Sequence, residues 1–583
     1  MNIEEKFTLA VQNQQKNNLE IAKKLYNDVL KLNPNHLASL NNIADLFNTL
    51  GEYQRAINSY EKVIKIKPNY AITHNNLGII FYKLQEFQKA KRYFKKAIEI
   101  NPNLVDVYIN LGAVFTVLKE DQKALNYFEK AIEINPKNVV AYNSLGNIFY
   151  RGNDYNKAIT FYEKAIKIDP KYLDSYNNLG VIFNVLGKYQ KAKRIFEKII
   201  KINPNYAVGY NNLGSIHNKL GNFYEAINNY KKALDLDATL ISAQKRIAAT
   251  YVGQLDLDNA ISSSHQALRL YHKTADFFNQ SITLFRLKHD VQQAKYLISK
   301  NYKINGIDQF QKIGVEILGR KANKEDENNF NKRILLTPEE IDLLLPFYKS
   351  NHTYEPKIIS GSHINPNKNW LEVEEEYFNN SKQVIYIDDF LSEETVKELR
   401  QFCLVSKVWN KEYYNPFLGA FSDNGFISPI HLQIAIDLKK KLPRLFGPHE
   451  LGTLWGYKYD STLGKGINVH ADFAIHNLNF WITPDEFNNN KNSGGLKIYD
   501  VPAPENWTFK DYNARPDKIY QFLKDNNASY INIPYKFNRA VLFNSSYFHE
   551  TDVIDFKDEY VGRRINMTYL FGRRLVKKKI DEL

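Results

Sequence analysis

Apolar residues in the first half of the chain recur at helical spacing, in blocks that repeat every 34 positions. Prolines mark the period, at Pro34, Pro68, Pro102, Pro136, Pro170 and Pro204. One block, residues 139–172, reads VVAYNSLGNIFYRGNDYNKAITFYEKAIKIDPKY. It holds two stretches with one apolar face and a short polar turn between them, and proline ends the pair because it cannot continue a helix. The pattern predicts pairs of helices that stack along the chain.

Small residues keep the same period. Leu-Gly pairs recur at 77–78, 111–112, 145–146, 179–180 and 213–214, and alanines recur at Ala90, Ala124, Ala158 and Ala192. Small residues let neighbouring helices pack closely, and this spacing resembles the tetratricopeptide repeat (TPR). The resemblance implies an all-α superhelix, an α-solenoid with a concave binding groove, over residues 1–300. We expect about six regular units, followed by degenerate capping helices.

One polar position on the first helix of each unit is a candidate for binding a partner. It precedes each Leu-Gly pair or its equivalent, and it holds Asn42, Asn76, Asn110, Ser144, Asn178 and Asn212. An amide both donates and accepts hydrogen bonds, so these asparagines would hold the backbone of an extended peptide or protein segment in the groove. The row resembles the asparagine ladder in the repeats of O-GlcNAc transferase. The alternative is compositional, because the chain uses asparagine freely throughout.

The helical pattern fades near residue 300, and the rest of the chain divides in two. Residues 321–333, KANKEDENNFNKR, are charged and polar and predict a boundary. A short helical and extended stretch follows, so 301–380 is expected to be a linker segment. From residue 381 onward, short apolar runs rich in β-branched and aromatic residues alternate with turn residues, after one amphipathic helix at 391–406. Such a series predicts a β-sandwich or barrel domain over 381–583.

Length, cysteine count and charge narrow the class of protein. A chain of 583 residues is too long for a single compact core, so more than one domain is expected. Its single cysteine, Cys403, allows no internal disulfide. The first residues lack a signal-peptide pattern, and no apolar run reaches the length of about 18 residues typical of a membrane span. We therefore expect a cytoplasmic protein without membrane contact. The net charge is +14, but lysines lie beside glutamates at exposed helical positions, so a nucleic-acid partner is not expected.

Two histidines and an aspartate in the β-rich part have the spacing of a metal site. His470 and Asp472, in INVHADFAIHNLNFWIT at 467–483, are two residues apart, so on a strand their side chains point to one side. His549, in NSSYFHETD, follows an apolar strand and is the candidate third ligand. Two histidines and one carboxylate form the facial triad of non-haem iron(II) oxygenases. The alternative is an aspartate that caps a turn and a histidine at the surface.

A second signal lies in the strand GRRINMTYLFG. Arg564, Asn566 and Thr568 alternate with apolar residues, so one face of this strand is polar. An arginine fork on an inward strand face suits a dicarboxylate, because its planar donors match carboxylate oxygens.

With these motifs, residues 384–574 resemble the 2-oxoglutarate- and iron(II)-dependent dioxygenases of the prolyl-4-hydroxylase-like group. The matching elements are the HxD of His470 and Asp472, the GGL at 494–496, the histidine at His549, and the R-x-N-x-T strand from Arg564. The resemblance implies a double-stranded β-helix (jelly-roll) with flanking helices, and it implies Fe(II), 2-oxoglutarate as cosubstrate, and O2. His470, Asp472 and His549 would then be the catalytic iron ligands, and Arg564 would bind the far carboxylate of 2-oxoglutarate.

The resemblance also implies further contacts with the cosubstrate. Tyr459 and Tyr457 lie on the strand before the HxD, where relatives carry a tyrosine that contacts 2-oxoglutarate. In relatives that tyrosine is usually somewhat closer to the histidine. Asn479 and Asn566 lie on inward strand faces and are the candidates for contacts with the cosubstrate carboxylates.

Four features nearby have structural or open assignments. His476 is expected to make a supporting hydrogen bond or a packing contact rather than to bind metal. Arg563 is expected to face outward and Arg539 to be structural. The insert at 501–530 is either a lid over the site or a packed surface loop.

The two halves together predict a dioxygenase that hydroxylates a peptide or protein held by the TPR groove. One alternative is a small-molecule or glycan hydroxylase whose repeats only recruit partners. The other is a non-catalytic scaffold with a degenerate oxygenase fold, and the intact His470, Asp472, His549 and Arg564 argue against it.

Overall fold

The structure is a computed structural model that describes residues 1–278, 281–321, 332–413, 417–460 and 466–573. The chain forms two compact units, Met1–Ile216 and His217–Leu583. This division groups residues 217–300, which carry the end of the repeat pattern, with the β-rich part of the chain.

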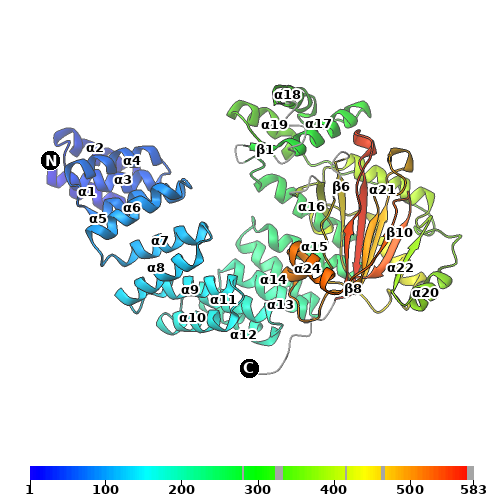
Figure 1. The fold of residues 1–583 in the computed structure, drawn as a ribbon. Coiled ribbons are helices and arrows are strands. Elements are labelled where there is room, and N and C mark those ends of the chain that lie inside the picture. Colours follow the sequence, from blue (N-terminus) through cyan, green and yellow to red (C-terminus); the bar gives the residue numbers. More distant parts are fainter. Residues whose placement is uncertain (279–280, 322–331, 414–416, 461–465, 574–583) are drawn as a thin grey trace. The chain divides into compact units, whose positions relative to one another are not determined.

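The first unit consists of helical hairpins, one for each block of the repeat (Figure 1). The helices are α1 (Ile3–Gln15), α2 (Leu19–Leu32), α3 (Leu37–Thr49), α4 (Tyr53–Ile66), α5 (Ala71–Lys83), α6 (Phe87–Ile100), α7 (Val105–Val117), α8 (Asp121–Ile134), α9 (Val139–Arg151), α10 (Tyr155–Ile168), α11 (Leu173–Val185) and α12 (Tyr189–Ile202). Helix α13 (Ala207–Lys219) begins in this unit and ends in the next. The predicted helix pairs are confirmed.

The repeated glycines are needed where the two helices of a hairpin touch. A Cβ atom on Gly112 would lie 2.6 Å from the ring of Phe128, and one on Gly180 would lie 2.7 Å from the ring of Phe196. Protein interiors are close-packed and have no room for such an overlap. Glycine on the first helix therefore makes room for an aromatic ring of the second helix to pack against it.

The second unit continues with three helices of the array and then changes character. These helices are α14 (Phe223–Leu236), α15 (Ile241–Gln254) and α16 (Leu257–Thr274). Next comes a segment that we call the cap, residues 281–349, which contains β1 (Ser281–Thr283), α17 (Leu284–Ser299), α18 (Ile307–Lys321), β2 (Arg333–Leu335) and α19 (Pro338–Lys349). The cap has its own apolar core, in which Phe310 stacks on Phe347. Part of the segment expected to be a linker thus forms packed helices.

The β-rich part contains a seven-stranded antiparallel sheet and a smaller three-stranded one. The order in the large sheet is β3-β10-β7-β12-β6-β5-β4, with β3 (Val384–Ile387), β4 (Lys411–Glu412), β5 (Phe417–Phe421), β6 (Leu451–Tyr459), β7 (His476–Trp481), β10 (Ala540–Asn544) and β12 (Ile565–Phe571). The small sheet has the order β11-β8-β9, with β8 (Leu496–Pro502), β9 (Tyr530–Ile533) and β11 (Tyr547–Thr551). The two sheets share one apolar core, in which Trp481 and Val541 of the large sheet meet Ile498 and Ile533 of the small sheet. The predicted β-rich character is confirmed as two antiparallel sheets in a domain that also contains helices, and the double-stranded β-helix stays a prediction.

Helices cover the opposite face of the large sheet (Figure 1). They include α20 (Trp370–Asn379), α21 (Glu393–Val405) and α22 (Pro429–Lys441), and α15, α16 and α17 add Val252, Leu268 and Phe285 to the same core. Helices α23 (Phe509–Asn513) and α24 (Pro516–Asp525) lie in the insert after β8. Phe402 of α21 and Leu438 of α22 share a buried core with Met567 of β12. Both faces of β12 are therefore buried. They differ in chemistry, because polar residues on one face alternate along the strand with apolar residues on the other. Within the described ranges, no helix has both the length and the apolar character that crossing a membrane requires.

Candidate metal centre and its cavity

The fold brings His470, Asp472 and His549 together. His470 and Asp472 lie in the segment between β6 and β7, and His549 lies on β11. The backbone N–H of His470 donates to the carbonyl of His549 at 3.0 Å, and the reverse bond is 2.8 Å long. This antiparallel bridge fixes the distance between two residues that are far apart in the sequence.

The three side chains present ligand atoms that lie within 4.8 Å of one another. Nε2 of His549 is 3.5 Å from Oδ2 of Asp472, and Nε2 of His470 is 4.0 Å from its Oδ1. Nδ1 of His470 is 2.8 Å from the carbonyl of Asn468, and Nδ1 of His549 is 3.1 Å from the carbonyl of Tyr547. A carbonyl only accepts, so Nδ1 carries the proton in both rings and the lone pair of each Nε2 is free for a metal.

The protonation states also suit metal binding. Burial, together with the nearby His549 ring, lowers the pKa of His470 to about 4. Burial alone would raise the pKa of Asp472, but the adjacent His549 and His470 rings and the hydrogen bond from Asn477 outweigh it and lower that pKa. At neutral pH this gives a neutral imidazole beside a carboxylate, which are the forms that bind metal. The residues present therefore fit a divalent metal with two nitrogen ligands and one oxygen ligand.

A cavity of about 430 Å³ opens beside the three residues. Its floor is the inner face of β6, β7 and β12, and its described lining includes every one of the predicted cosubstrate residues: Tyr457, Tyr459, Asn479, Arg564 and Asn566. The cavity is within the size range of small-ligand sites. The structure thus places the predicted cosubstrate residues around one space next to the histidines and the aspartate.

A chain of amide side chains crosses the floor and begins at the aspartate. Asn477 donates to Oδ2 of Asp472 at 2.5 Å, and Asn479 donates to Oδ1 of Asn477 at 2.5 Å. Oδ1 of Asn479 then accepts from Asn566 at 3.0 Å and from Thr568 at 2.6 Å. Each amide in the chain is oriented by the next, so the carboxylate of Asp472 is held in one orientation.

Arg564 lies at the edge of the cavity with unused donors. Its side chain is 1% exposed, and its Nε donates to the carbonyl of Gly494 at 2.6 Å. The guanidinium lies 4.8 Å from the ring centre of Tyr459 and 5.6 Å from that of Trp481. Nη1 and Nη2 are buried and have no hydrogen-bond partner among the described residues. Buried donors without partners are costly, and a carboxylate in the cavity would satisfy two of them at once.

The two tyrosines and the outer wall give the cavity an aromatic side. Burial raises the pKa of Tyr457 and of Tyr459 above the ordinary tyrosine value, so both hydroxyls stay protonated and able to donate. Beyond Tyr457 the wall consists of Phe417, Phe421 and Trp455. The charged side chains among the described lining residues are limited to Asp472 and Arg564, apart from the histidines.

The insert is a part of the site that sequence reasoning left open. Helix α23 lines the cavity with Phe509 and Asn513, and Nδ2 of Asn513 donates to the carbonyl of Ala471 at 3.2 Å. The backbone N–H of Ala471 in turn donates to the carbonyl of Tyr512 at 2.8 Å. The insert therefore packs directly on the HxD segment. No spacing or composition in the sequence indicated these contacts.

Three other assignments can now be compared with the structure. His476 faces the helices, where its Nδ1 is 3.1 Å from the hydroxyl of Tyr377. Arg539 pairs with Asp388 at 2.5 Å, which is a structural contact. The expectation that Arg563 faces outward is wrong, because its side chain is 1% exposed. It does lie on the opposite face from Arg564, but cap helix α17 covers that face.

The asparagine row of the repeats forms bonds between neighbouring hairpins. Each of these asparagine side chains is half-buried and donates to a polar side chain of the preceding hairpin. The pairs are Asn42 to Tyr26, Asn76 to Asp45 and Tyr60, Asn110 to Asn75, Asn178 to Asn143 and Asn147, and Asn212 to Asn177. The amide nitrogens thus have intramolecular partners in the structure. A role of the same side chains in peptide binding stays a prediction.

Comparisons with known proteins identify the first half of the chain. Family models described as TPR repeat match residues 44–85 and 146–187, and models described as tetratricopeptide repeat match 71–104, 105–138, 127–160, 173–206 and 207–240. The N-terminal part of the chain is a TPR array. No curated protein matches the chain.

Three solved structures are each similar to a minor part of this chain. MamA is 27% identical, with 28% of this chain and 95% of MamA covered and a TM-score of 0.26. YrrB, described as a TPR protein with an unusual peptide-binding site, is 21% identical, with 32% and 95% covered and a TM-score of 0.26. PilF of Pseudomonas aeruginosa is 23% identical, with 34% and 91% covered and a TM-score of 0.31.

Proposed function

We propose that this protein is a 2-oxoglutarate- and Fe(II)-dependent dioxygenase that hydroxylates a peptide or protein recruited by its TPR groove. The observation that carries the proposal is one cavity that holds both a His-Asp-His group and a buried arginine whose Nη1 and Nη2 lack partners in the described part of the chain. The first suits Fe(II) and the second suits a dicarboxylate. The two antiparallel sheets that share a core around this cavity fit a double-stranded β-helix.

The residues of this chain would act by binding, orienting and excluding water. Bound Fe(II) would supply the oxidative chemistry that couples 2-oxoglutarate and O2 to hydroxylation of a C–H bond. His470, Asp472 and His549 would hold the metal, and Arg564 would bind the distal carboxylate with Nη1 and Nη2. The protonated hydroxyl of Tyr459 lies beside the guanidinium and would donate to the same carboxylate.

The amide chain would contact the cosubstrate, and the aromatic wall would contact the substrate. Asn479 and Asn566 lie on the floor between Asp472 and Arg564 and would contact the cosubstrate. The wall of Phe421 and Trp455 would receive the reacting group of the substrate and keep water away from it. With no further charge on the described lining, an uncharged group is favoured there, because a buried charge without a partner is costly.

The TPR array supports a peptide or protein as the partner, because repeat grooves bind extended segments. Among the described residues the asparagine oxygens of the row remain candidates for backbone contacts. The alternatives are a small-molecule or glycan hydroxylase whose repeats recruit partners, and a non-catalytic scaffold. We also propose a cytoplasmic location and no nucleic-acid partner, on composition and charge alone.

Succinate formation from 2-oxoglutarate tests the proposal. We expect Fe(II)-dependent succinate in the wild-type protein, its loss in Asp472→Ala, and a raised KM for 2-oxoglutarate in Arg564→Ala. Adding peptides that bind the array should increase the rate if they are substrates. Wild-type rates of succinate formation in Asp472→Ala would refute the assignment.

A further inference from the structure

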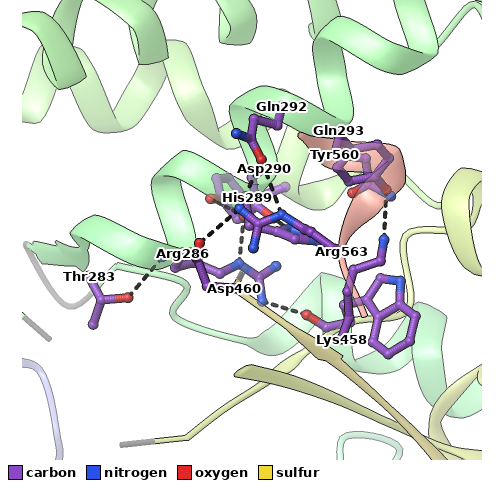
Figure 2. Close-up of polar contacts among 12 residues, drawn as sticks. Thr283, Arg286, His289, Asp290, Gln292, Gln293, Lys458, Asp460, Tyr560 and Arg563 are labelled. Carbon is purple, nitrogen blue, oxygen red and sulfur yellow. Dashed lines mark hydrogen bonds and ion pairs between the residues drawn. The ribbon is translucent and has the colours of Figure 1, made fainter. Parts of the chain in front are cut away.

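A cluster of buried and half-buried polar side chains connects the cap to the sheet (Figure 2). Strand β6 ends at Tyr459 and β12 begins at Ile565, so Tyr459 and Arg564 stand at the ends of two neighbouring strands. One backbone bond joins them, from the N–H of Tyr459 to the carbonyl of Arg564, and it is 3.0 Å long. Because side chains alternate along a strand, the next residues, Asp460 and Arg563, point away from the cavity.

These two residues form a fully buried ion pair. Nη2 of Arg563 lies 3.0 Å from Oδ2 of Asp460, and the two side chains are 1% and 0% exposed. The pair spans the Tyr459–Arg564 rung from its outer side. A buried ion pair is maintained only when further hydrogen bonds hold its geometry.

The cap provides that support through Gln292 of helix α17. Oε1 of Gln292 accepts from Nε of Arg563 at 3.1 Å and from Nη2 at 2.8 Å (Figure 2). Two donors of one guanidinium thus meet one oxygen of the cap, which fixes the rotation of the guanidinium plane. Gln292 is more than two hundred residues before Arg563 in the sequence, and no motif relates the two.

This support acts at the end of the ladder between β6 and β12. The ends of strands open more readily than their centres, and no regular rung follows Tyr459 and Arg564 in the described ladder. On the cavity side, the described contacts of the Arg564 guanidinium are the hydrogen bond to Gly494 and the ring contacts. A binding arginine must be held within about 0.5 Å of its productive position. Movement of the rung would displace both Arg564 and Tyr459.

We propose that Gln292, Arg563 and Asp460 form a clamp that positions Arg564 and Tyr459 for the cosubstrate, so that the cap is part of the oxygenase site. The inference rests on the proposed function, because it takes Arg564 as the residue that binds 2-oxoglutarate. None of the three clamp residues lines the cavity. They are positioning residues that act through the rung.

The adjacent residue on α17 offers a matched control. Gln293 is buried whereas Gln292 is half-buried, and Gln293 also connects the cap to the β-rich part, but it donates to the carbonyls of Leu404 and Ser406 at 3.4 and 3.2 Å. Neither of these two bonds involves Arg563 or Asp460. Gln293→Ala therefore loosens the cap without removing the acceptor of the clamp.

The test measures binding of Mn(II) and then of 2-oxoglutarate to the full chain without oxygen, by isothermal titration calorimetry. We expect Gln292→Ala to weaken 2-oxoglutarate binding by about tenfold, as loss of a supporting residue commonly does. Mn(II) affinity should change less than twofold, because the clamp does not contact His470, Asp472 or His549. Gln292→Glu keeps the acceptor oxygen and should restore most of the affinity, and Gln293→Ala should leave it unchanged.

Three other results would contradict the proposal. Wild-type affinity in Gln292→Ala would overturn the clamp while leaving the proposed function intact. Equal weakening in Gln292→Ala and Gln293→Ala would also overturn it, because the effect would then be general loosening of the cap. A wild-type protein that binds Mn(II) but not 2-oxoglutarate would overturn the proposed function and the clamp with it.

Discussion

Replacement of a single repeat glycine tests the packing of the TPR array. In the hairpin of α9 and α10, a Cβ on Gly146 would lie 2.7 Å from Cδ1 and 2.9 Å from Cζ of the Tyr162 ring. The ring cannot move aside, because Tyr162 is 1% exposed and its hydroxyl donates to Asn147 at 2.6 Å. Overpacking of this kind costs about 1–3 kcal/mol of unfolding free energy.

The same hairpin contains the control. Gly152 ends α9 with φ −72° and ψ −2°, which any residue can adopt, and the nearest atom to its added Cβ is 3.5 Å away. Gly152→Ala should be stabilising by about 0.4–1 kcal/mol, because alanine restricts the unfolded chain. Gly146→Ala should be stabilised by a similar amount through its unfolded state, but overpacking against the Tyr162 ring should lower its unfolding free energy. We therefore expect the two variants to differ by about 1–3 kcal/mol.

Urea unfolding followed by circular dichroism measures this difference, and a double-mutant cycle assigns it. In a Tyr162→Ala background the ring is absent, so Gly146→Ala should lose most of its cost. Equal stability of Gly146→Ala and Gly152→Ala, or a cost that persists without the ring, would refute the argument that the aromatic contact requires glycine.

The remaining predictions concern protonation, metal binding and the asparagine row. Burial lowers the pKa of His431 to about 3, while the unfolded chain takes up that proton near pH 6.5. The contribution of this residue should therefore lower the unfolding free energy by about 1.4 kcal/mol per pH unit as pH falls from about 6.5 to about 3. Urea titrations at several pH values should show that the unfolding free energy depends less steeply on pH in His431→Phe. Mn(II) at about a hundred times its Kd should raise the unfolding free energy by about 2.7 kcal/mol, and thermal scans should show no such rise in Asp472→Ala. Asn178→Ala removes hydrogen bonds to Asn143 and Asn147 and should cost about 1–2 kcal/mol in urea unfolding; unchanged stability would show that the row does not couple the hairpins.

The repeat region was largely predictable because its information is local. Period, helix pairs and close-packed small residues all follow from contacts within one block of 34 residues. The bonding partners of the asparagines were not predicted, because each one lies in the preceding unit. A periodic sequence shows that units stack but leaves the rotation of one unit on the next undetermined.

The residues that line the candidate site were predictable from the sequence, but the residues that pack behind them were less so. Alternation along β12 indicated that Arg564 and Asn566 share a face, and the spacing of His470 and Asp472 indicated a shared side. Alternation cannot show what covers the opposite face, so Arg563 was wrongly expected to face outward.

By itself, the sequence determined the helical hairpins of the array, the β-rich character of the second half and the polar faces that line the cavity, because these depend on periods of a few residues. Only the tertiary structure decided that His549 pairs with His470, that the insert packs on the HxD segment and that Gln292 reaches Arg563. Those contacts join segments distant in the chain. They depend on how sheets and helices pack, which short-range periodicity does not record.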